Sequence, residues 1–508
     1  MGKMNRRHFL EGTLAVSAAL AGAGLRRSAI GADSSAEPVA DSPRDVKINI
    51  KPLYAGMVHS GVWVGPCRPK DTKPPEEERA SHKKRFPVEI ENLRRTVGSA
   101  ARVLEPIYYE TDDYFDVRGS TDELFAKLDS EKEEVDLYLQ FGSVGRCFAA
   151  LVGERYKKPV AIPYTISGRE LSAYLRGKKL EGYTPIDADE LTSLIALLRA
   201  RKVYRQTNIL AIINHPQKIP RRLPNVITDY DYLEKEFGIR VHNADFDELA
   251  EEMRRVRESK PIVEQTQGLA DKLIAAAVDS NIKREYVVAD VEFYHAVKNL
   301  MGRHGCNAFS IDCYEICASR LSEKWKSVPC LTHSLLKDEG YPSACEGDLN
   351  ALLIMDLLMA LTKKAVYMGN LHIHSEEVFD INHSVPGLKM LGFDKPDLPY
   401  QLRYRIQQGW GTKLQIDFSK IEEKAVTIAQ MNPWSNQILA VRGEVIGVDG
   451  MDEIYCNPGA LISFFDAKGY FKKQDSYGHH GVMVYGDYTK ELERLAGMLG
   501  MEIEVYHA

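Results

Sequence analysis

Val135-Asp-Leu-Tyr-Leu-Gln-Phe141 is a short apolar run with the length of a buried β-strand. Gly142-Ser-Val-Gly145 follows it and predicts a tight turn. The residues from Arg146 to Tyr156 then predict a helix, and those from Pro159 to Pro163 predict a second strand. A strand, a helix and a strand in this order form a βαβ unit, which places parallel strands in one sheet with helices over its faces. This stretch therefore predicts an α/β fold.

A second set of alternating elements follows further along the chain. Asn208 to Asn214 predicts a buried strand that ends in a polar turn. Ile239 to His242 predicts another strand, and Asp245 to Glu258 predicts the helix after it. Ala308 to Asp312 predicts a strand that ends on a carboxylate, and open α/β sheets bind ligands at such strand ends. We therefore expect a second α/β domain.

Beyond about residue 398 the hydrophobic period shifts towards two. Lys413 to Phe418, Ala425 to Gln430 and Ile438 to Ile446 each alternate, which predicts antiparallel strands of a small barrel or sandwich. A final helix and strand are predicted after them. The expected domains are an N-terminal α/β domain, a second α/β domain and a C-terminal α+β metal-site domain with a β-barrel-like part: residues 46–203, 204–335 and 336–508.

The composition is that of an ordinary soluble globular protein. Of the 508 residues, 44% are hydrophobic and 27% are charged, which argues against a disordered chain. The net charge of -6 gives no overall attraction to nucleic acid. After the N-terminus no apolar run reaches the roughly 20 residues that span a membrane. The eight cysteines form no Cys-x-x-Cys pair, so neither a disulfide scaffold nor a zinc site is expected. The charged stretch from Arg68 to Phe86 is expected to be an exposed loop.

The N-terminus has the layout of an export signal. Arg6-Arg7 and Phe9-Leu10 precede a weakly apolar run from Gly12 to Leu25, with small residues after it. The arginine pair makes residues 1–32 similar to a twin-arginine signal peptide, and residues 33–45 are expected to be a linker. We therefore expect export by this route and a periplasmic or extracytoplasmic location. The alternative is a basic, alanine-rich tail.

Two carboxylates stand directly before a predicted helix that is apolar on nearly all sides, Ala351 to Leu361. Glu346 and Asp348 are hard oxygen donors two positions apart, at a helix N-terminus where backbone N–H groups can hold a carboxylate. A plainer interpretation is that the acidic pair only caps the helix.

Imidazoles and further polar groups follow this pair. His372 and His374 point to the same face if the segment is extended, although polar residues at a strand edge show the same pattern. His479 and His480 form a second pair, for which a simple turn is the alternative. The further candidates are Asn370, Glu376 and His383.

Together these residues predict a mixed carboxylate–imidazole site for a divalent cation, Mn²⁺ or another ion such as Mg²⁺. Such an ion can hold two oxygens of a sugar as a Lewis acid and stabilise an enediolate. Flanking carboxylates can then move the proton.

Three segments resemble the L-fucose isomerase and L-arabinose isomerase superfamily. Ala344-Cys-Glu346-Gly-Asp348 and the apolar helix after it resemble the first metal and catalytic carboxylate segment of that family. Ser476-Tyr-Gly-His479-His480 resembles its last metal-histidine segment, with a closing helix and strand behind it. Asn382-His383-Ser-Val-Pro-Gly-Leu-Lys-Met390 resembles a motif of fucose-isomerase-like proteins. The motifs cover about residues 340–508, and the family's two Rossmann-like domains and C-terminal barrel match the predicted order.

The resemblance implies isomerisation of a free aldose to a ketose through an enediol, with Mn²⁺ or a similar ion. Glu346 would be a metal ligand and general acid/base, and His479 a metal ligand. Asn370 aligns with a second carboxylate of the family, and its amide can bind a metal but cannot accept a proton as a base. Asp348, Glu376 and Glu377 are the nearby candidates for a substitute acid.

Three functions follow from these observations. The first is the metal-dependent sugar isomerase. The second is an exported, non-catalytic carbohydrate-binding protein on the same scaffold, which Asn370 would suit. The third is a metal-dependent lyase or hydrolase of sugar derivatives. No Walker or Gly-x-Gly-x-x-Gly loop in a suitable context implies ATP or a dinucleotide. The expected partners are a small-molecule sugar and, by the resemblance, further copies of the chain in a homo-oligomer.

Overall fold

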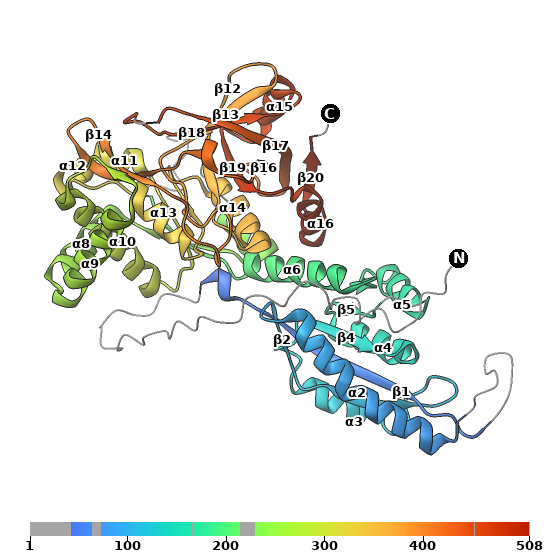
Figure 1. Cartoon of the computed structure of the whole chain (residues 1–508). Coiled ribbons are helices and arrows are strands. Elements are labelled where there is room, and N and C mark those ends of the chain that lie inside the picture. The colour runs from blue at the N-terminus through green and yellow to red at the C-terminus, as the bar shows by residue number, and fades with distance from the viewer. Residues whose placement is uncertain (1–41, 63–72, 164–165, 214–228, 452, 507–508) are drawn as a thin grey trace. The chain divides into compact units, whose positions relative to one another are not determined.

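The computed structural model describes residues 42–62, 73–163, 166–213, 229–451 and 453–506. The predicted export signal lies outside the described residues, as does most of the predicted linker. The described part of the chain divides into two compact units, with the described residues of 47–199 in the first and those of 42–46 and 200–506 in the second (Figure 1). Each unit is described by itself below. The division into three domains stays a prediction.

The first unit is a parallel sheet covered by helices. β1 pairs with β2 along its first half and with β3 along its second half, and β4 lies on its other side. β5 and β6 continue the sheet beyond β4. The strands are β1 (Ile48–Met57), β2 (Ala101–Val103), β3 (Ile107–Thr111), β4 (Leu137–Phe141), β5 (Val160–Ala161) and β6 (Gly182–Tyr183). The helices are α2 (Pro75–Val97), α3 (Thr121–Asp129), α4 (Arg146–Tyr156), α5 (Ile166–Gly177) and α6 (Ala188–Arg205). The predicted βαβ unit is present as β4, α4 and β5.

The expectation of an exposed loop over Arg68–Phe86 is wrong from Pro75 onward, where α2 begins. Pro75 stands in the first turn, where its missing N–H is no loss. Three glutamates follow it and complement the positive end of the helix dipole. The buried residues of α2 all lie in its last eight positions, so the charged stretch is the solvent-facing half of a helix.

The second unit begins with a four-stranded parallel sheet in the order β11-β10-β7-β8. Its strands are β7 (Asn208–Ile212), β8 (Arg240–Ala244), β10 (Ala308–Ile311) and β11 (Ser343–Ala344). The accompanying helices are α7 (Tyr230–Phe237), α8 (Phe246–Glu258), α9 (Lys260–Ala276), α10 (Arg284–Arg303), α11 (Cys313–Ala318), α12 (Leu321–Trp325) and α13 (Cys330–Asp338). A small three-stranded sheet is formed by β9 (Asp279–Ser280), β14 (Gln401–Ile406) and β15 (Trp410–Gln415).

The C-terminal strands of this unit close into a barrel. The order β16-β19-β12-β13-β18-β17 returns to its start because β16 also pairs with β17, and β20 lies parallel to β17. The strands are β12 (Tyr367–Ile373), β13 (Val378–Asn382), β16 (Ala425–Met431), β17 (Gln437–Asp449), β18 (Gly459–Ser463), β19 (His480–Tyr485) and β20 (Glu502–Val505). Two helices, α15 (Ala467–Lys473) and α16 (Thr489–Leu499), accompany them. The predicted α/β fold with a sheet-rich C-terminal part is confirmed.

The helix α14 (Leu349–Thr362) joins the two layers of the second unit. Every residue from Leu349 to Leu361 is buried, as the apolar run predicts. α14 packs against β10 and β11 of the parallel sheet and against β16 and β19 of the barrel. The start of this helix therefore lies where the parallel sheet and the barrel meet.

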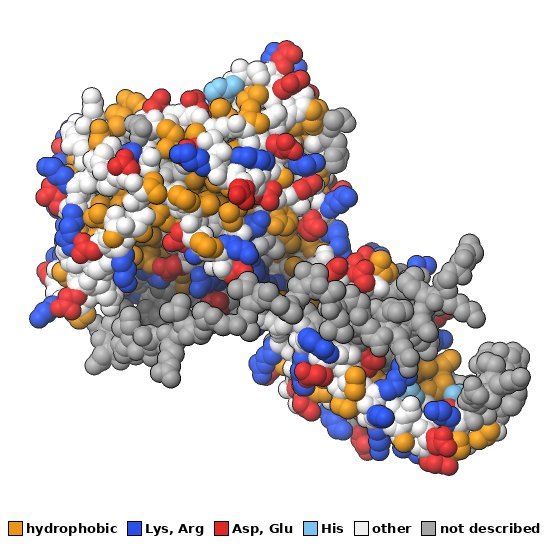
Figure 2. Space-filling model, viewed as in Figure 1, with side chains coloured by type: hydrophobic (Ala, Val, Ile, Leu, Met, Phe, Trp, Pro, Cys, Tyr) orange, Lys and Arg blue, Asp and Glu red, His pale blue; other side chains and the backbone are white. Residues whose placement is uncertain are grey.

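The surface carries both charges. Figure 2 shows Lys and Arg side chains interspersed with Asp and Glu side chains over the viewed face. Within the described ranges, no helix combines the length and the apolar character that crossing a bilayer requires.

A buried carboxylate connects three segments of the second unit. Asp290 on α10 is fully buried, and its Oδ1 accepts hydrogen bonds from Ser327 Oγ and from the N–H of Val328, both at 2.8 Å. Its Oδ2 accepts from the N–H of Thr412 on β15 at 2.5 Å. Burial raises the pKa of Asp290 to about 7, although these donors oppose the shift. Each donor would be left buried without its acceptor if the carboxylate were removed.

We expect the substitution Asp290→Ala to lower the free energy of unfolding by about 3 kcal/mol, because it leaves buried donors unpaired. Chemical denaturation measures this change. Asp271→Ala is the matched control, since Asp271 forms an exposed ion pair with Arg284 and its loss should cost under about 1 kcal/mol. Equal losses for the two variants would contradict the role given to Asp290.

Candidate active site

Glu346 lies directly beyond β11, at the carboxyl edge of the parallel sheet. Its backbone φ is +62°, in the left-handed region that side chains other than glycine rarely adopt. Gly347 follows with a φ of +69°, and its N–H donates to the carbonyl of Ile311 at 2.9 Å. This turn keeps Glu346 buried, with 6% of the residue exposed. Strain of this kind costs about 1–3 kcal/mol and is concentrated at functional sites.

Three imidazoles surround the Glu346 carboxylate. His383 Nε2 lies 3.4 Å from Glu346 Oε1, and His480 Nε2 and His479 Nε2 lie 3.8 and 4.0 Å from Oε2. The side chains of His383 and His480 are each 1% exposed, whereas that of His479 is 46% exposed. The predicted pairing of Glu346 with His479 is thus present in space, and two further histidines join it.

Asp348 holds one of these imidazoles. Its Oδ2 accepts a hydrogen bond from His480 Nδ1 at 2.7 Å, which leaves Nε2 of the same ring facing Glu346. Its Oδ1 accepts from the N–H of Ala351 at 2.8 Å and caps α14. The structure therefore gives Asp348 both the capping contact and a contact with the site.

Three polar residues occupy one face of the barrel wall opposite this turn. Asn370 on β12 is directly paired with His480 on β19 and with Asn382 on β13. Directly paired residues of antiparallel strands point to the same face. Since His480 faces Glu346, Asn370 and Asn382 lie on the face of the barrel that carries the site.

The position of His383 is fixed by a tyrosine. The Tyr367 hydroxyl accepts a hydrogen bond from the N–H of His383 at 2.6 Å. Among the described residues, both ring nitrogens of His383 and the Nε2 of His480 have no hydrogen-bond partner although they are buried. Buried polar atoms normally have a partner, so this arrangement favours a ligand between them and Glu346.

Asp380 is a buried carboxylate near the site that the sequence analysis missed. It stands on β13 two positions before Asn382, and its Oδ2 accepts from Asn382 Nδ2 at 2.6 Å. Its Oδ1 lies 2.9 Å from His374 Nε2 and 3.7 Å from His372 Nδ1. The signal in the sequence is the Asp-x-Asn pattern before His383, because both side chains of such a pattern share one strand face.

Two of the candidate acids lie elsewhere. Glu376 is exposed in the turn between β12 and β13, where its Oε1 pairs with Lys468 Nζ at 2.8 Å. Glu377 beside it is also exposed. The structure brings neither of them to Glu346.

Electrostatics favour ionisation of Glu346 and oppose protonation of His383 and His479. Burial opposes ionisation of Glu346, but the neighbouring His383, His480 and His479 outweigh it and hold its pKa at about 2. Burial lowers the pKa of His383, although Glu346 opposes this shift. Burial and the neighbouring His480 lower the pKa of His479. An ionised carboxylate and unprotonated imidazoles are the forms that bind a metal ion.

The residues present fit a divalent cation. One ligand atom each from Glu346, His479 and His480 lies within 4.8 Å of the other two. The unpartnered Nε2 of His383 lies 3.4 Å from the same carboxylate, and the hydrogen bond from His480 to Asp348 is the contact that usually orients a metal-binding imidazole.

Comparison with known proteins gives a distant relationship. Two curated sulfoquinovose isomerases, from Priestia aryabhattai and from Priestia megaterium (strain ATCC 12872 / QMB1551), are each 22% identical to this chain over 320 residues. The alignment covers 60% of this chain and 68% of each relative. No model of a known protein family matches. The chain is thus a distant relative of sugar isomerases.

The wall of the site leaves no room for a side chain at Gly369. A Cβ there would lie 2.8 Å from the backbone of Asn382 on the neighbouring strand. We expect Gly369→Ala to separate β12 from β13 and to lower the free energy of unfolding by about 1–3 kcal/mol. Urea denaturation tests this. Gly497→Ala on α16 is the control, because its Cβ would meet nothing within 4 Å and should be neutral or stabilising by up to about 1 kcal/mol. A neutral Gly369→Ala would contradict the close pairing.

Proposed function

We propose that this protein is a metal-dependent isomerase that interconverts an aldose and a ketose through an enediol. The observation that carries the proposal is the buried Glu346 carboxylate faced by unpartnered imidazole nitrogens of His383 and His480. The distant relationship to sugar isomerases supports the same reaction class. The resemblance of the three motifs to the L-fucose and L-arabinose isomerases supports an unmodified or deoxy sugar as substrate, with Mn²⁺ as the cation.

Glu346, His479 and His480 would hold the cation, with His383 and the Asn370 amide as further candidates. When bound, such an ion polarises the sugar carbonyl and stabilises the negative oxygens of the enediolate. The isomerisation moves one proton from C2 to C1 while the carbonyl moves from C1 to C2, and a second proton passes between the two oxygens. Glu346 is ionised and buried, so its free oxygen is suited to accept and return the carbon-bound proton.

A second acid is needed to pass the proton between the sugar oxygens. Asn370 cannot do this, because a side-chain amide is neither an acid nor a base near neutral pH. Asp380 is a buried carboxylate on the same wall, next to Asn382, and His372 and His374 lie at its Oδ1. We assign the second proton transfer to Asp380 and its histidines rather than to Glu376.

A non-catalytic sugar-binding protein is the second candidate, and Asn370 is the observation that favours it. A site with fewer carboxylates could bind a sugar through a metal without turning it over. The predicted export and homo-oligomeric state are compatible with either function and stay predictions.

Mixing the purified protein with Mn²⁺ and a panel of aldoses, including L-fucose, L-arabinose and sulfoquinovose, tests the proposal by NMR. We expect interconversion of at least one aldose with its ketose, and deuterium from the solvent at the carbon next to the carbonyl. Glu346→Gln keeps the size of the side chain but removes the base, and we expect kcat to fall at least about 10³-fold. Asp380→Asn should lower kcat about 10²-fold.

Glu377→Gln is the matched control for both variants, because Glu377 is an exposed acid on the turn next to β13. It should leave kcat unchanged. If no aldose is converted but a sugar still binds in the presence of Mn²⁺, the binding function replaces the isomerase. If Glu346→Gln retains full activity, the site has been misassigned.

Two variants of Asp348 distinguish its capping of α14 from its orienting of the His480 ring. Asp348→Asn keeps an oxygen for the N–H of Ala351, but its amide N–H₂ faces His480 Nδ1 and forces that ring to carry its proton on Nε2. We expect Mn²⁺ affinity, measured by isothermal titration calorimetry, to fall 10- to 100-fold. The free energy of unfolding should change little, whereas Asp348→Ala should also lose about 1 kcal/mol of capping. Unchanged Mn²⁺ affinity in both variants would show that Asp348 only caps the helix.

A further inference from the structure

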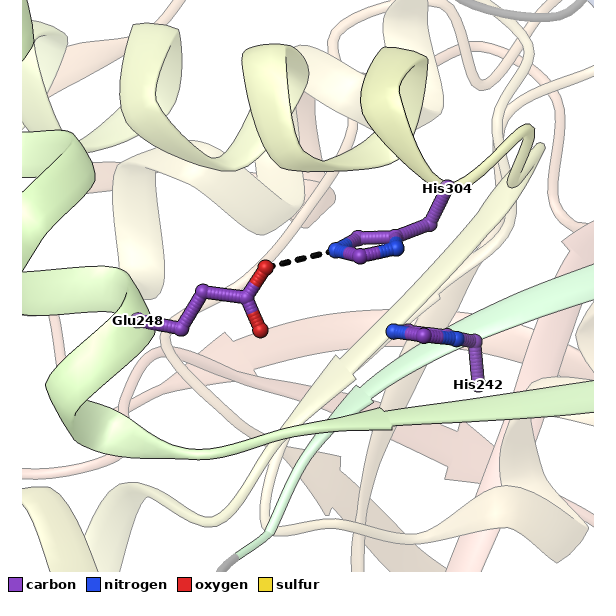
Figure 3. Close-up of side chains that lie close together, drawn as sticks. All are labelled: His242, Glu248 and His304. Atoms are coloured by element: carbon purple, nitrogen blue, oxygen red, sulfur yellow. Dashed lines mark hydrogen bonds and ion pairs between the residues drawn. The ribbon is translucent and has the colours of Figure 1, made fainter.

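A second group of side chains of the types that bind metals lies at β8, the edge strand of the parallel sheet opposite β11. His242 is on β8, Glu248 is in the first turn of α8, and His304 is the residue that ends α10. One ligand atom of each lies within 4.8 Å of the other two. Figure 3 shows both imidazoles projecting towards the Glu248 carboxylate from separate elements. In the order β11-β10-β7-β8, this group and Glu346 lie on opposite edges.

The two imidazole rings are stacked rather than spread apart. Their centroids are 3.7 Å apart with an angle of 20° between the ring planes. His304 Nε2 lies 2.6 Å from Glu248 Oε1, and Arg303 Nη1 lies 3.8 Å from the same oxygen.

A hollow gives access to this group. Its volume is about 710 Å³, and His242, Asn243 and His304 contribute to its lining together with residues at the start of β7 and β8. His242 is exposed at this hollow. A tetrahedral ion needs ligand atoms about 3.3–3.6 Å apart at bond lengths near 2.0–2.2 Å. From separations of at most 4.8 Å the ligand atoms therefore need to approach by up to about 1.5 Å, and the stacked rings need to turn so that their nitrogens face one ion.

We propose that His242, Glu248 and His304 form a second metal site, specific for a borderline transition-metal ion such as Zn²⁺ or Co²⁺. Two imidazoles and one carboxylate are a ligand set that such ions prefer over Mg²⁺. Three protein ligands leave a fourth position open towards the hollow. An ion there would link the edge strand β8 to the start of α8 and the end of α10. Its role is to stabilise this edge of the second unit.

Zn²⁺ titration of the full chain by calorimetry, with Co²⁺ absorption as a spectroscopic readout, tests the site. Compared with the unsubstituted protein, the double variant His242→Ala/His304→Ala should lose one equivalent of bound Zn²⁺. It should also lose the visible absorption of Co²⁺ in tetrahedral coordination. Zn²⁺ should raise the melting temperature of the unsubstituted protein more than that of the variant. Glu248→Gln should weaken the affinity about tenfold or more, because it keeps the side-chain shape and removes the charge.

His59→Ala is the control, since His59 contacts a carboxylate, Glu78 Oε1, at 2.9 Å in the first unit but lies outside the group. It should bind as much Zn²⁺ as the unsubstituted protein. Equal Zn²⁺ stoichiometry and affinity in the double variant and the unsubstituted protein would overturn the proposal. Isomerase activity and Mn²⁺ binding at Glu346 are separate readouts, so a failure of the proposed function leaves this test intact.

Discussion

The carboxylate of Asp348 couples the fold of the second unit to its candidate active site. One oxygen caps α14, the helix that is buried between the parallel sheet and the barrel, and the other oxygen binds His480 on the barrel. The position of the imidazole therefore depends on where the helix begins, and the start of the helix depends on the turn at Glu346. Because the carboxylate can accept at both oxygens at once, helix, turn and barrel strand are held in one register.

The site lies at the junction of two sheets for a topological reason. Strands of a parallel sheet bring their carboxyl ends to one edge, and there Glu346 follows β11. A barrel closed by pairing of β16 with β17 presents a rigid wall to that edge, with Asn370 and His480 at paired positions. Neither part would form the site alone. The strained backbone of Glu346 is tolerated because packing on both sides determines it.

The sequence predicted the helices and strands better than the contacts between the side chains of the site. The apolar run of α14 and the alternation from Val441 to Ile446 in β17 were sufficient because burial on all sides and burial on one face leave different periods. The charged start of α2 led to the wrong prediction of a loop, because the few buried residues of this helix are confined to its end. Motifs located Glu346 and the His479–His480 pair. The contact of His383 with Glu346 and the proposed role of Asp380 depend instead on strand pairing between distant segments, which no local pattern encodes.

Asn370 changes the charge of the site as well as its proton chemistry. A divalent ion held by Glu346 and neutral imidazoles keeps a net positive charge, whereas a second carboxylate would cancel it. In the proposed reaction the uncancelled charge would strengthen the attraction for the enediolate oxygens, because charges interact more strongly around the buried Glu346 than in water. Without a second carboxylate, the protein would also hold the ion less tightly. In the proposed mechanism Asp380, whose Oδ2 accepts a hydrogen bond from Asn382, would supply a carboxylate for proton transfer without being a ligand of the ion.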